Sequence, residues 1–517
     1  MVTEENVDVN REVSEECGVS IALQRYLEER MVKDLTPEDA LSLVKDASDP
    51  SRSDFLKQLF INILYDDKRL LERELGISDL DRAFSNQSFI ERVAEVAVER
   101  ARLWPNAPLL RISYKTLRRN DAAKLLKGLN FGLIYGAETI LFQDTVLAYQ
   151  VDEACSRLNG HKVNVIGVHY NWLTDDGKAS RGIIVDNSWR VKEVEFEEPV
   201  DLNVIQILHL PSEDERETHK RLSTFFSSRG IPQINPFDSS CRADDKFTTH
   251  ELWSNLKDNL NSPAYALIKK GKSIKEALRV LARFSREISD SREKKTVEVY
   301  VQPNTGTEGR MVNMFTLNLS KEPNEWTDVT EHLSRILRVD DALVRERRGN
   351  VLFKRPSDPR GLFRYISIRI NAAWDGSKFV AESGYAQTSR DASIPVASRS
   401  RGGDIISLND AFKNLYYKVH GKYSKLRIQP SFLSKIKKAV EVAAGGLNIG
   451  LNKEDYLKMV GIDILLEVDG GDVKPVLLEA NPRPAGLASS VSLEKALSMR
   501  PKLMISYALF NYIRSIQ

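Results

Sequence analysis

The stretch "VLLEANPRP", Val476–Pro484, decides how the C-terminal half of this chain is interpreted. It is an apolar strand sequence, yet Glu479 and Asn481 lie two residues apart within it. Side chains of a strand alternate between its two faces, so these two oxygen-bearing side chains point the same way. A buried strand with a carboxylate and a carboxamide on one face is typical of a binding site.

A second strand precedes this one and completes a hairpin. "GIDILLE" carries Asp463, and Asp469-Gly470-Gly471-Asp472 supplies the turn. A loop with an odd number of residues, centred on Gly471, places Asp463 directly opposite Glu479, about 5 Å away. Two facing carboxylates destabilise a sheet unless a cation lies between them, and Mg²⁺ is the simplest candidate. The alternative is a solvent-facing edge hairpin, but the apolar residues around both carboxylates favour burial.

Composition and charge argue against several classes of protein. Of the 517 residues, 42% are hydrophobic and 29% charged, as in ordinary soluble domains. The 75 basic and 73 acidic residues are interleaved and give a net charge of +2, which does not favour nucleic-acid binding. Cys17, Cys155 and Cys241 match neither a disulfide framework nor a metal site. With no membrane-length apolar run and an acidic N-terminal stretch, we expect a cytoplasmic protein that does not bind membranes.

The spacing of apolar residues changes along the chain. From Val19 to about Leu129 apolar side chains recur at helical steps, which predicts a helical accessory domain at 1–130. We expect homo-oligomers to form through these helices. After Phe131, short β-branched runs alternate with helices, which predicts an α/β domain at 131–240.

The same alternation continues from Ser240 to the C-terminus. Strands are predicted on both sides of the turn Asp375-Gly376, and a long helix is predicted to end at Gly445-Gly446. The fold class is therefore α/β (α+β).

The hairpin resembles a known superfamily. "GIDILLE" followed by "LLEANPRP" is similar to the magnesium-binding hairpin of ATP-grasp enzymes, among them D-alanine–D-alanine ligase, glutathione synthetase and the ribosomal-protein glutamate ligases. The resemblance extends over about residues 131–517. It implies a preceding α/β domain and then an ATP-grasp domain at 241–517, with a lid subdomain at about 262–350.

The resemblance also implies cofactors. ATP is bound with Mg²⁺, as one ion or two, and Mn²⁺ is a substitute. The residues implied to hold the metal ion against the β- and γ-phosphates are Asp463, Glu479 and Asn481.

Two upstream segments are similar to phosphate-binding parts of this superfamily. In "DDKFTTHELW" the resemblance implies that Lys246 reaches the nucleotide phosphates. In "VYVQPNTGTEGRMV" it implies a loop that closes over ATP, in which Gly306, Thr307 and Gly309 let backbone N–H groups approach phosphate oxygens. The alternative for this loop is a plain β-turn.

Further segments complete the implied site. "NVLFKRP" resembles the hinge strand, which implies that Phe353 and Lys354 flank adenine. Arg364 is implied to face the phosphates. The alternative is that Arg364 and Arg369 lie on a strand face that is exposed to solvent. "ASRSRGGDIISL" resembles a loop that brings Gly402-Gly403 near the γ-phosphate. Arg483, two residues after Asn481, is the candidate for gripping the acceptor carboxylate or the acyl-phosphate.

One position departs from the pattern. The superfamily usually has a lysine immediately before Pro303, and this chain has Gln302. A lost charged contact of this kind costs about 2–4 kcal/mol of transition-state stabilisation. Either a neighbour such as Lys294, Lys295 or Arg310 supplies the cation, or the protein is a weak enzyme.

Three functions follow from the resemblance. The leading hypothesis is an ATP- and Mg²⁺-dependent carboxylate–amine ligase that acts on an amino acid, peptide or small metabolite. The alternatives are a phosphotransferase on the same fold, and a nucleotide-binding regulatory protein in which Gln302 marks lost catalysis. Incubation with candidate acids distinguishes the three. A ligase releases phosphate only with an amine, a phosphotransferase transfers a phosphoryl group without one, and a regulatory protein does neither.

Overall fold

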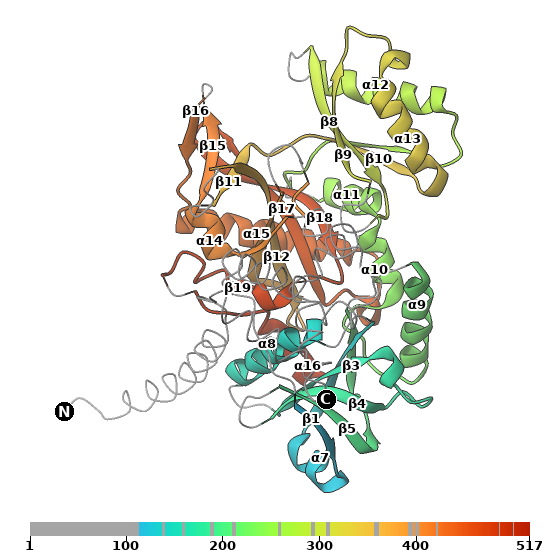
Figure 1. Cartoon of the computed structure of the whole chain (residues 1–517), viewed down its shortest axis with the longest axis vertical. Coiled ribbons are helices and arrows are strands. Elements are labelled where there is room, and N and C mark those ends of the chain that lie inside the picture. The colour runs from blue at the N-terminus through green and yellow to red at the C-terminus, as the bar shows by residue number, and fades with distance from the viewer. Residues whose placement is uncertain are drawn as a thin grey trace, which may run out of the picture. The chain divides into compact units, whose positions relative to one another are not determined.

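Figure 1 shows the structure, a computed structural model of the whole chain. The described residues run from 113 to 516, with internal gaps at 137–139, 158–160, 187–190, 209–212, 257–259, 291–294, 307–310, 356–360, 391–395, 399–402, 420–421, 485 and 500. The chain divides into two compact units, Met1–Gln233 with Lys502–Gln517, and Ile234–Pro501. Among the described residues, no helix is long and apolar enough to cross a membrane.

The first unit is built on a six-stranded mixed sheet in the order β1-β5-β4-β3-β2-β6. Its strands are β1 (Ser113–Leu117), β2 (Leu129–Tyr135), β3 (Val163–His169), β4 (Ala179–Val185), β5 (Val191–Val200) and β6 (Val204–Ile207). Its helices are α7 (Arg119–Leu125), α8 (Ile140–Ser156), α9 (Glu213–Ser228) and α16 (Ala508–Ser515). The alternation of strands and helices expected after Phe131 is confirmed.

The expected helical domain at 1–130 lies almost entirely outside the described residues. Where the two overlap, helix is the wrong prediction for Ser113–Leu117, which form β1. This strand pairs in parallel with β5, and each of its residues pairs with one 79 positions further along the chain, so its backbone groups are satisfied by a distant segment. Tertiary pairing of this kind overrides local periodicity.

The second unit contains a small sheet with its own core. Its strands are β7 (Tyr265–Ile268), β8 (Thr296–Pro303), β9 (Asn313–Asn318) and β10 (Ala342–Glu346), all antiparallel, in the order β7-β10-β8-β9. The helices α12 (Ile274–Asp290) and α13 (Thr327–Val339) pack on this sheet through buried aliphatic side chains. These residues fall within the range where the lid subdomain was predicted.

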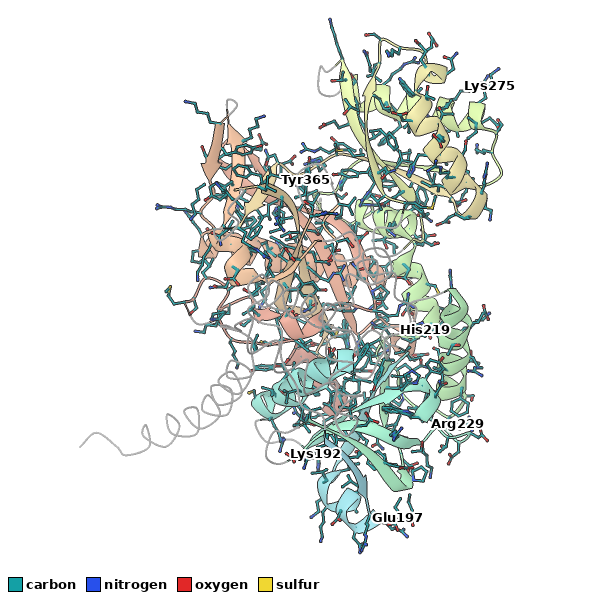
Figure 2. The ribbon with its side chains drawn as sticks, in the orientation of Figure 1. Lys192, Glu197, His219, Arg229, Lys275 and Tyr365 are labelled. Atoms are coloured by element: carbon teal, nitrogen blue, oxygen red, sulfur yellow. The ribbon has the colours of Figure 1, made fainter. Side chains whose placement is uncertain are left out.

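The larger sheet of the second unit has nine strands. They are β11 (Val351–Lys354), β12 (Phe363–Trp374), β13 (Phe379–Thr388), β14 (Ile405–Ser407), β15 (Leu415–Val419), β16 (Lys422–Lys425), β17 (Met459–Asp469), β18 (Asp472–Asn481) and β19 (Val491–Ser492). The helices of this part are α10 (Phe237–Asp244), α11 (Lys246–Ser254), α14 (Leu408–Lys413) and α15 (Pro430–Leu447). Figure 2 draws the side chains, with Tyr365 on β12 and Lys275 on α12 as landmarks. One continuous core joins α15 to the sheet.

The long helix α15 does not end where the sequence indicated. It runs through Gly445 and Gly446 to Leu447, and Asn448 is its C-cap. Neither of those glycines has a positive φ, whereas Gly450 has φ 78°. Gly446 instead lies where the helix packs closely on Leu256, because a Cβ there would lie 2.8 Å from Leu256 Cδ1.

Candidate functional site

The hairpin of β17 and β18 brings Asp463 and Glu479 directly opposite each other, as predicted, but for a different reason. The turn has two residues, Gly470 and Gly471, both with positive φ, rather than an odd number. That turn alone would pair Asp463 with Leu478. A β-bulge between Asp463 and Ile464 shifts the register by one residue and turns Glu479 to the face of Asp463.

A cation from the neighbouring strand lies at this carboxylate pair. Arg369 on β12 is opposite Asp463 in the register, and its Nε and Nη2 donate to the two Asp463 oxygens at 2.6 and 2.7 Å. Its Nη1 donates to the Tyr385 hydroxyl at 3.2 Å. Gly461 makes room for this guanidinium, because a Cβ there would lie 2.8 Å from Arg369 Cδ. The chain itself therefore supplies a positive charge that the sequence assigned to Mg²⁺.

The charges around the two carboxylates set their pKa values apart. Burial raises the pKa of Asp463 to about 6, against the lowering effect of Arg369. Burial also acts to raise the pKa of Glu479, but Lys246, Arg345 and Arg369 together lower it below its usual value. The three cations therefore outnumber the two carboxylates, and the cluster has an excess of positive charge.

Lys246 reaches this cluster from the first turn of α11. Asp245 caps that helix by accepting from the Thr248 N–H at 2.7 Å. The Lys246 ammonium donates to the Gly306 carbonyl, and Asn304 links the same loop to Asp245 and to the Phe247 N–H. The beginning of α11 is thus tied to the loop after β8, which is where Lys246 and Gly306 were predicted to meet phosphates.

Gln302 lies beside an arginine that sequence reasoning missed. Arg345 on β10 donates from Nη2 to Gln302 Oε1 at 3.2 Å and from Nη1 to the Leu478 carbonyl at 3.1 Å. Gln302 is 1% exposed and Arg345 5%. Of the neighbours proposed to compensate for Gln302, Lys295 is exposed, and Lys294 and Arg310 lie outside the described residues. In the sequence, the one feature that could have pointed to Arg345 is that it is a single arginine directly after the apolar residues of "DALVRE".

Several buried polar atoms around the cluster have no hydrogen-bond partner among the described residues. They are Gln302 Nε2, Arg345 Nε, Asn481 Nδ2 and both ring nitrogens of His250. His250 stacks on Tyr265 at 4.9 Å, and burial with the charges of Arg345 and Lys246 lowers its pKa to about 3. Buried polar groups are normally satisfied, so orphaned donors around a net positive charge indicate a site for an oxyanion.

The other predicted residues lie in different surroundings. Phe353 is a core residue of the large sheet, and the Lys354 ammonium lies 5.4 Å from the Phe363 ring centroid. Arg364 donates to Asp404 at 2.9 Å, and Arg355 shares that carboxylate. The alternative of a solvated strand face is wrong for both Arg364 and Arg369, because they are 6% and 8% exposed.

Two further predicted residues, Gly403 and Arg483, lie in the described part of the second unit. Gly403 packs on backbone, since a Cβ there would lie 1.7 Å from the Thr388 carbonyl oxygen. Arg483 follows the end of β18 and forms an ion pair with Asp244 of α10. Thr307, Gly309 and Gly402 lie outside the described residues.

The hairpin fits a divalent cation in part. No group of three or more His, Cys, Asp or Glu in the described part of the chain could hold a metal ion. Both oxygens of Asp463 already accept from Arg369, whereas Glu479 forms no ion pair in that part of the chain and Asn481 is half-buried beside it. Mg²⁺ is usually held by one or two carboxylates, with phosphates and waters completing its shell. Glu479 and Asn481 fit that role, and Asp463 fits it only by sharing its charge with Arg369.

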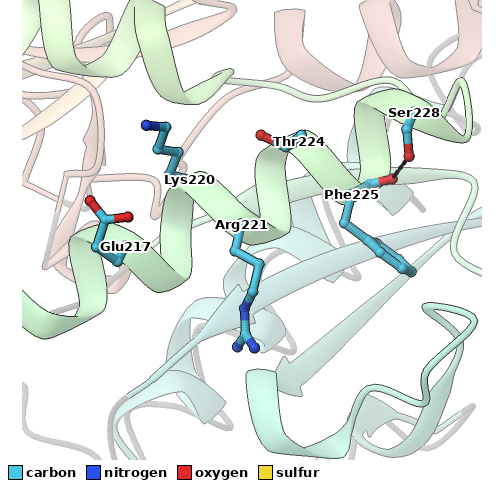
Figure 3. A pocket seen from close by; sticks show the side chains of 6 residues that line it. All are labelled: Glu217, Lys220, Arg221, Thr224, Phe225 and Ser228. Carbon is cyan, nitrogen blue, oxygen red and sulfur yellow. Dashed lines mark hydrogen bonds between the residues drawn. The ribbon is translucent and has the colours of Figure 1, made fainter.

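The first unit has a surface hollow that is unrelated to this cluster. Six residues of α9 line it, and Figure 3 shows them along one side of the helix: Glu217, Lys220, Arg221, Thr224, Phe225 and Ser228. The Ser228 hydroxyl donates to the Phe225 carbonyl of the same helix, and the charged residues of the hollow are exposed. It has none of the buried, unsatisfied donors of the hairpin cluster.

A scan against protein-family models finds no match, and a search of curated proteins finds no similar chain. Among solved structures, the chain is similar to D-alanyl-alanine synthetase A from Vibrio cholerae, with 12% identity, a TM-score of 0.41 and coverage of 76% of this chain and 99% of that chain. It is similar to the VanG D-Ala:D-Ser ligase from Enterococcus faecalis at 12% identity and a TM-score of 0.41, covering 75% and 99%. Macrocyclase MdnC from Microcystis aeruginosa, bound with precursor peptide MdnA, has 13% identity and a TM-score of 0.37, covering 75% and 100%.

The described elements are of the mixed α/β class, as the sequence predicted. Similarity at TM-scores below 0.5 assigns neither a reaction nor a residue.

Proposed function

We propose that the second unit binds ATP with Mg²⁺ and joins a carboxylate to an amine, forming ADP and phosphate. The observation that carries this proposal is the hairpin cluster, in which Lys246, Arg345 and Arg369 surround Asp463 and Glu479. Buried donors without acceptors lie in the same cluster. A polyanion such as a nucleoside triphosphate would satisfy those donors and offset the positive charge.

Each part of the cluster has a role in this proposal. Lys246 would exchange its bond to the Gly306 carbonyl for a phosphate oxygen, because both lie at the loop after β8. The backbone of Gly306, Thr307 and Gly309 would cover the phosphates. Glu479 and Asn481 would hold Mg²⁺, which supplies charge neutralisation at the phosphates when bound.

The proposed chemistry needs little covalent participation from the protein. An oxygen of the substrate carboxylate attacks the γ-phosphorus of ATP, and the bond to the β-phosphate oxygen breaks, giving an acyl-phosphate and ADP. The amine then attacks the acyl carbon, phosphate leaves, and the amine loses a proton. The protein's part is to position the reactants and to neutralise charge. Arg483 and Arg364 remain the candidates for holding the carboxylate or the acyl-phosphate.

A direct experiment separates binding from chemistry. Thermal unfolding of the native protein is measured with ATP, ADP and GTP, each with and without Mg²⁺ and with Mn²⁺ as a substitute. Phosphate release is then measured with pools of amino acids and small peptides as carboxylates and amines. A stabilisation by Mg²⁺-ATP together with amine-dependent phosphate release supports the ligase. No stabilisation by any nucleotide contradicts the proposal.

One observation favours a regulatory protein as the second candidate. Arg369 occupies both oxygens of Asp463, which removes a metal ligand that the resemblance implied. A site with a permanent guanidinium in that position can still bind nucleotide. Nucleotide binding without phosphate release on any acid and amine tested would support this function over the ligase.

A further inference from the structure

Arg345 is a buried cation at the position where the sequence lacks one. We propose that Arg345 contacts a phosphate of the bound nucleotide, and that Gln302 is the residue that positions it. This proposal rests on the proposed nucleotide binding. It assigns to β10 the charge that the sequence pattern led us to expect on β8.

The register of the small sheet explains why these two side chains meet. Gln302 on β8 is opposite Leu343 on β10, and Arg345 follows Leu343 by two residues, on the same face. A guanidinium only donates, so the Gln302 oxygen must face Arg345 and the Gln302 amide NH₂ must point elsewhere. That NH₂ group has no hydrogen-bond partner among the described residues.

Two contacts fix the guanidinium and leave its Nε without an acceptor. The Leu478 carbonyl accepts from Nη1 and Gln302 Oε1 accepts from Nη2, whereas Nε has no hydrogen-bond partner in the described part of the chain. Arg345 Nε and Gln302 Nε2 are therefore two donors of one hydrogen-bonded pair, both without an acceptor. A phosphate oxygen is the acceptor that such a pair recognises.

The surroundings leave the charge of Arg345 only partly compensated. Within the described residues Arg345 forms no ion pair. The carboxylate with the strongest electrostatic effect on its pKa is Glu479, which also interacts with Lys246 and Arg369. The nearby His250 ring is neutral at pH 7, since its pKa is lowered to about 3. A buried cation without its own counter-ion is costly unless a ligand supplies the negative charge.

The test compares the affinities of ATP and adenosine in the full-length protein. In Arg345→Gln we expect the dissociation constant of Mg²⁺-ATP to rise at least about tenfold and that of adenosine to stay the same, because adenosine has no phosphate. In the double variant Arg345→Gln with Gln302→Lys, a lysine returns the cation to β8, and we expect ATP affinity to recover most of the loss.

Two further variants separate this role from a structural one. Gln302→Glu keeps the shape and the bond to Arg345 but neutralises its charge, so ATP affinity should fall by a similar factor even if Arg345→Gln does not fold. Arg348→Gln is the matched control, because Arg348 is also an arginine with a low side-chain exposure, 13%, but its partners are Glu467, Glu346 and Asn261. We expect this control to leave the ratio of ATP to adenosine affinity unchanged.

The outcomes are distinguishable. Native protein that binds ATP, with Arg345→Gln and Gln302→Glu binding it equally well, overturns the role of Arg345 and leaves the proposed function intact. A parallel loss of ATP and adenosine affinity in both variants, without rescue by the lysine, also overturns it, because that pattern is structural. Native protein that binds no nucleotide overturns the proposed function and this role with it.

Discussion

Glu479 is the hairpin carboxylate that we propose as a ligand of Mg²⁺, and its replacement is the simplest test of that role. Glu479→Gln keeps the size of the side chain and the strand register, so the fold should persist. We expect phosphate release with Mg²⁺-ATP to fall at least about 100-fold, because the metal loses its charged ligand. Steady-state phosphate assays and thermal unfolding measure the two effects. Asp472→Asn, an exposed carboxylate of the same hairpin, is the control and should change neither.

Arg369 gives a pH-dependent prediction, because it neutralises Asp463. Replacing Arg369 by Gln leaves a buried carboxylate without its partner, which costs about 3–5 kcal/mol when that carboxylate is ionised. Arg369 lowers the pKa of Asp463, which burial holds at about 6, so its loss raises this pKa further. The variant protein then takes up a proton at Asp463 that the unfolded chain, with its ordinary lower pKa, does not bind. Stability therefore falls as pH rises.

Urea unfolding at pH 5 and pH 8 measures this difference. We expect the destabilisation by Arg369→Gln to be larger at pH 8, where Asp463 must ionise, than at pH 5, where it is protonated. Lys435→Gln, which removes an exposed partner of Asp472, is the comparison and should change the stability little at either pH. An equal cost of Arg369→Gln at the two pH values would contradict the assignment of its charge to Asp463.

At the scale of elements, the loop after β8 should respond to nucleotide. Asn304 and Gly306 hold this loop to the first turn of α11, and Lys246 must leave the Gly306 carbonyl to reach a phosphate. We expect backbone amides in residues 304–310 to exchange hydrogen at least about tenfold more slowly with Mg²⁺-ATP than without, since the phosphates become their acceptors. Hydrogen exchange followed by mass spectrometry measures this, with residues 313–318 of β9 as an internal reference. Equal exchange in both states would mean that the segment is only a turn.

The hairpin shows how far an element can be predicted from its sequence. Alternation in "LLEANPRP" placed Glu479 and Asn481 on one face, and the facing of Asp463 and Glu479 was predicted. The two-residue turn and the β-bulge were not predicted, since a register shift depends on packing across strands. The partner cations were missed for the same reason: Arg369 and Arg345 come from β12 and β10, and local patterns do not tell which strands become neighbours.

At the scale of the whole molecule, alternating strands and helices were sufficient to predict the mixed α/β class. The strand pairing of the first sheet was harder to predict, because the residues of β1 pair with residues of β5 that lie 79 positions further along the chain. Leu117, the last residue of β1, and Ala122 of α7 are nevertheless buried in the core of the first unit. Residues 113–125 therefore belong to the α/β unit, whereas periodicity alone assigned them to the N-terminal helices.

This assignment changes where the chain can be shortened. A protein that begins at residue 112 keeps β1 and α7, and we expect it to bind Mg²⁺-ATP within about twofold of the full-length protein, because the hairpin cluster lies in the second unit. A protein that begins at residue 130 loses β1, exposes the edge of β5 and uncovers the buried side chains around Leu117, so it should unfold at a lower temperature and aggregate. Calorimetric titration and thermal unfolding of both proteins test this.

If ATP affinity disappears in the protein that begins at residue 112, the N-terminal residues are part of the nucleotide site and the division of the chain must be redrawn. If both shortened proteins are equally stable, β1 contributes less to the first sheet than its pairing indicates.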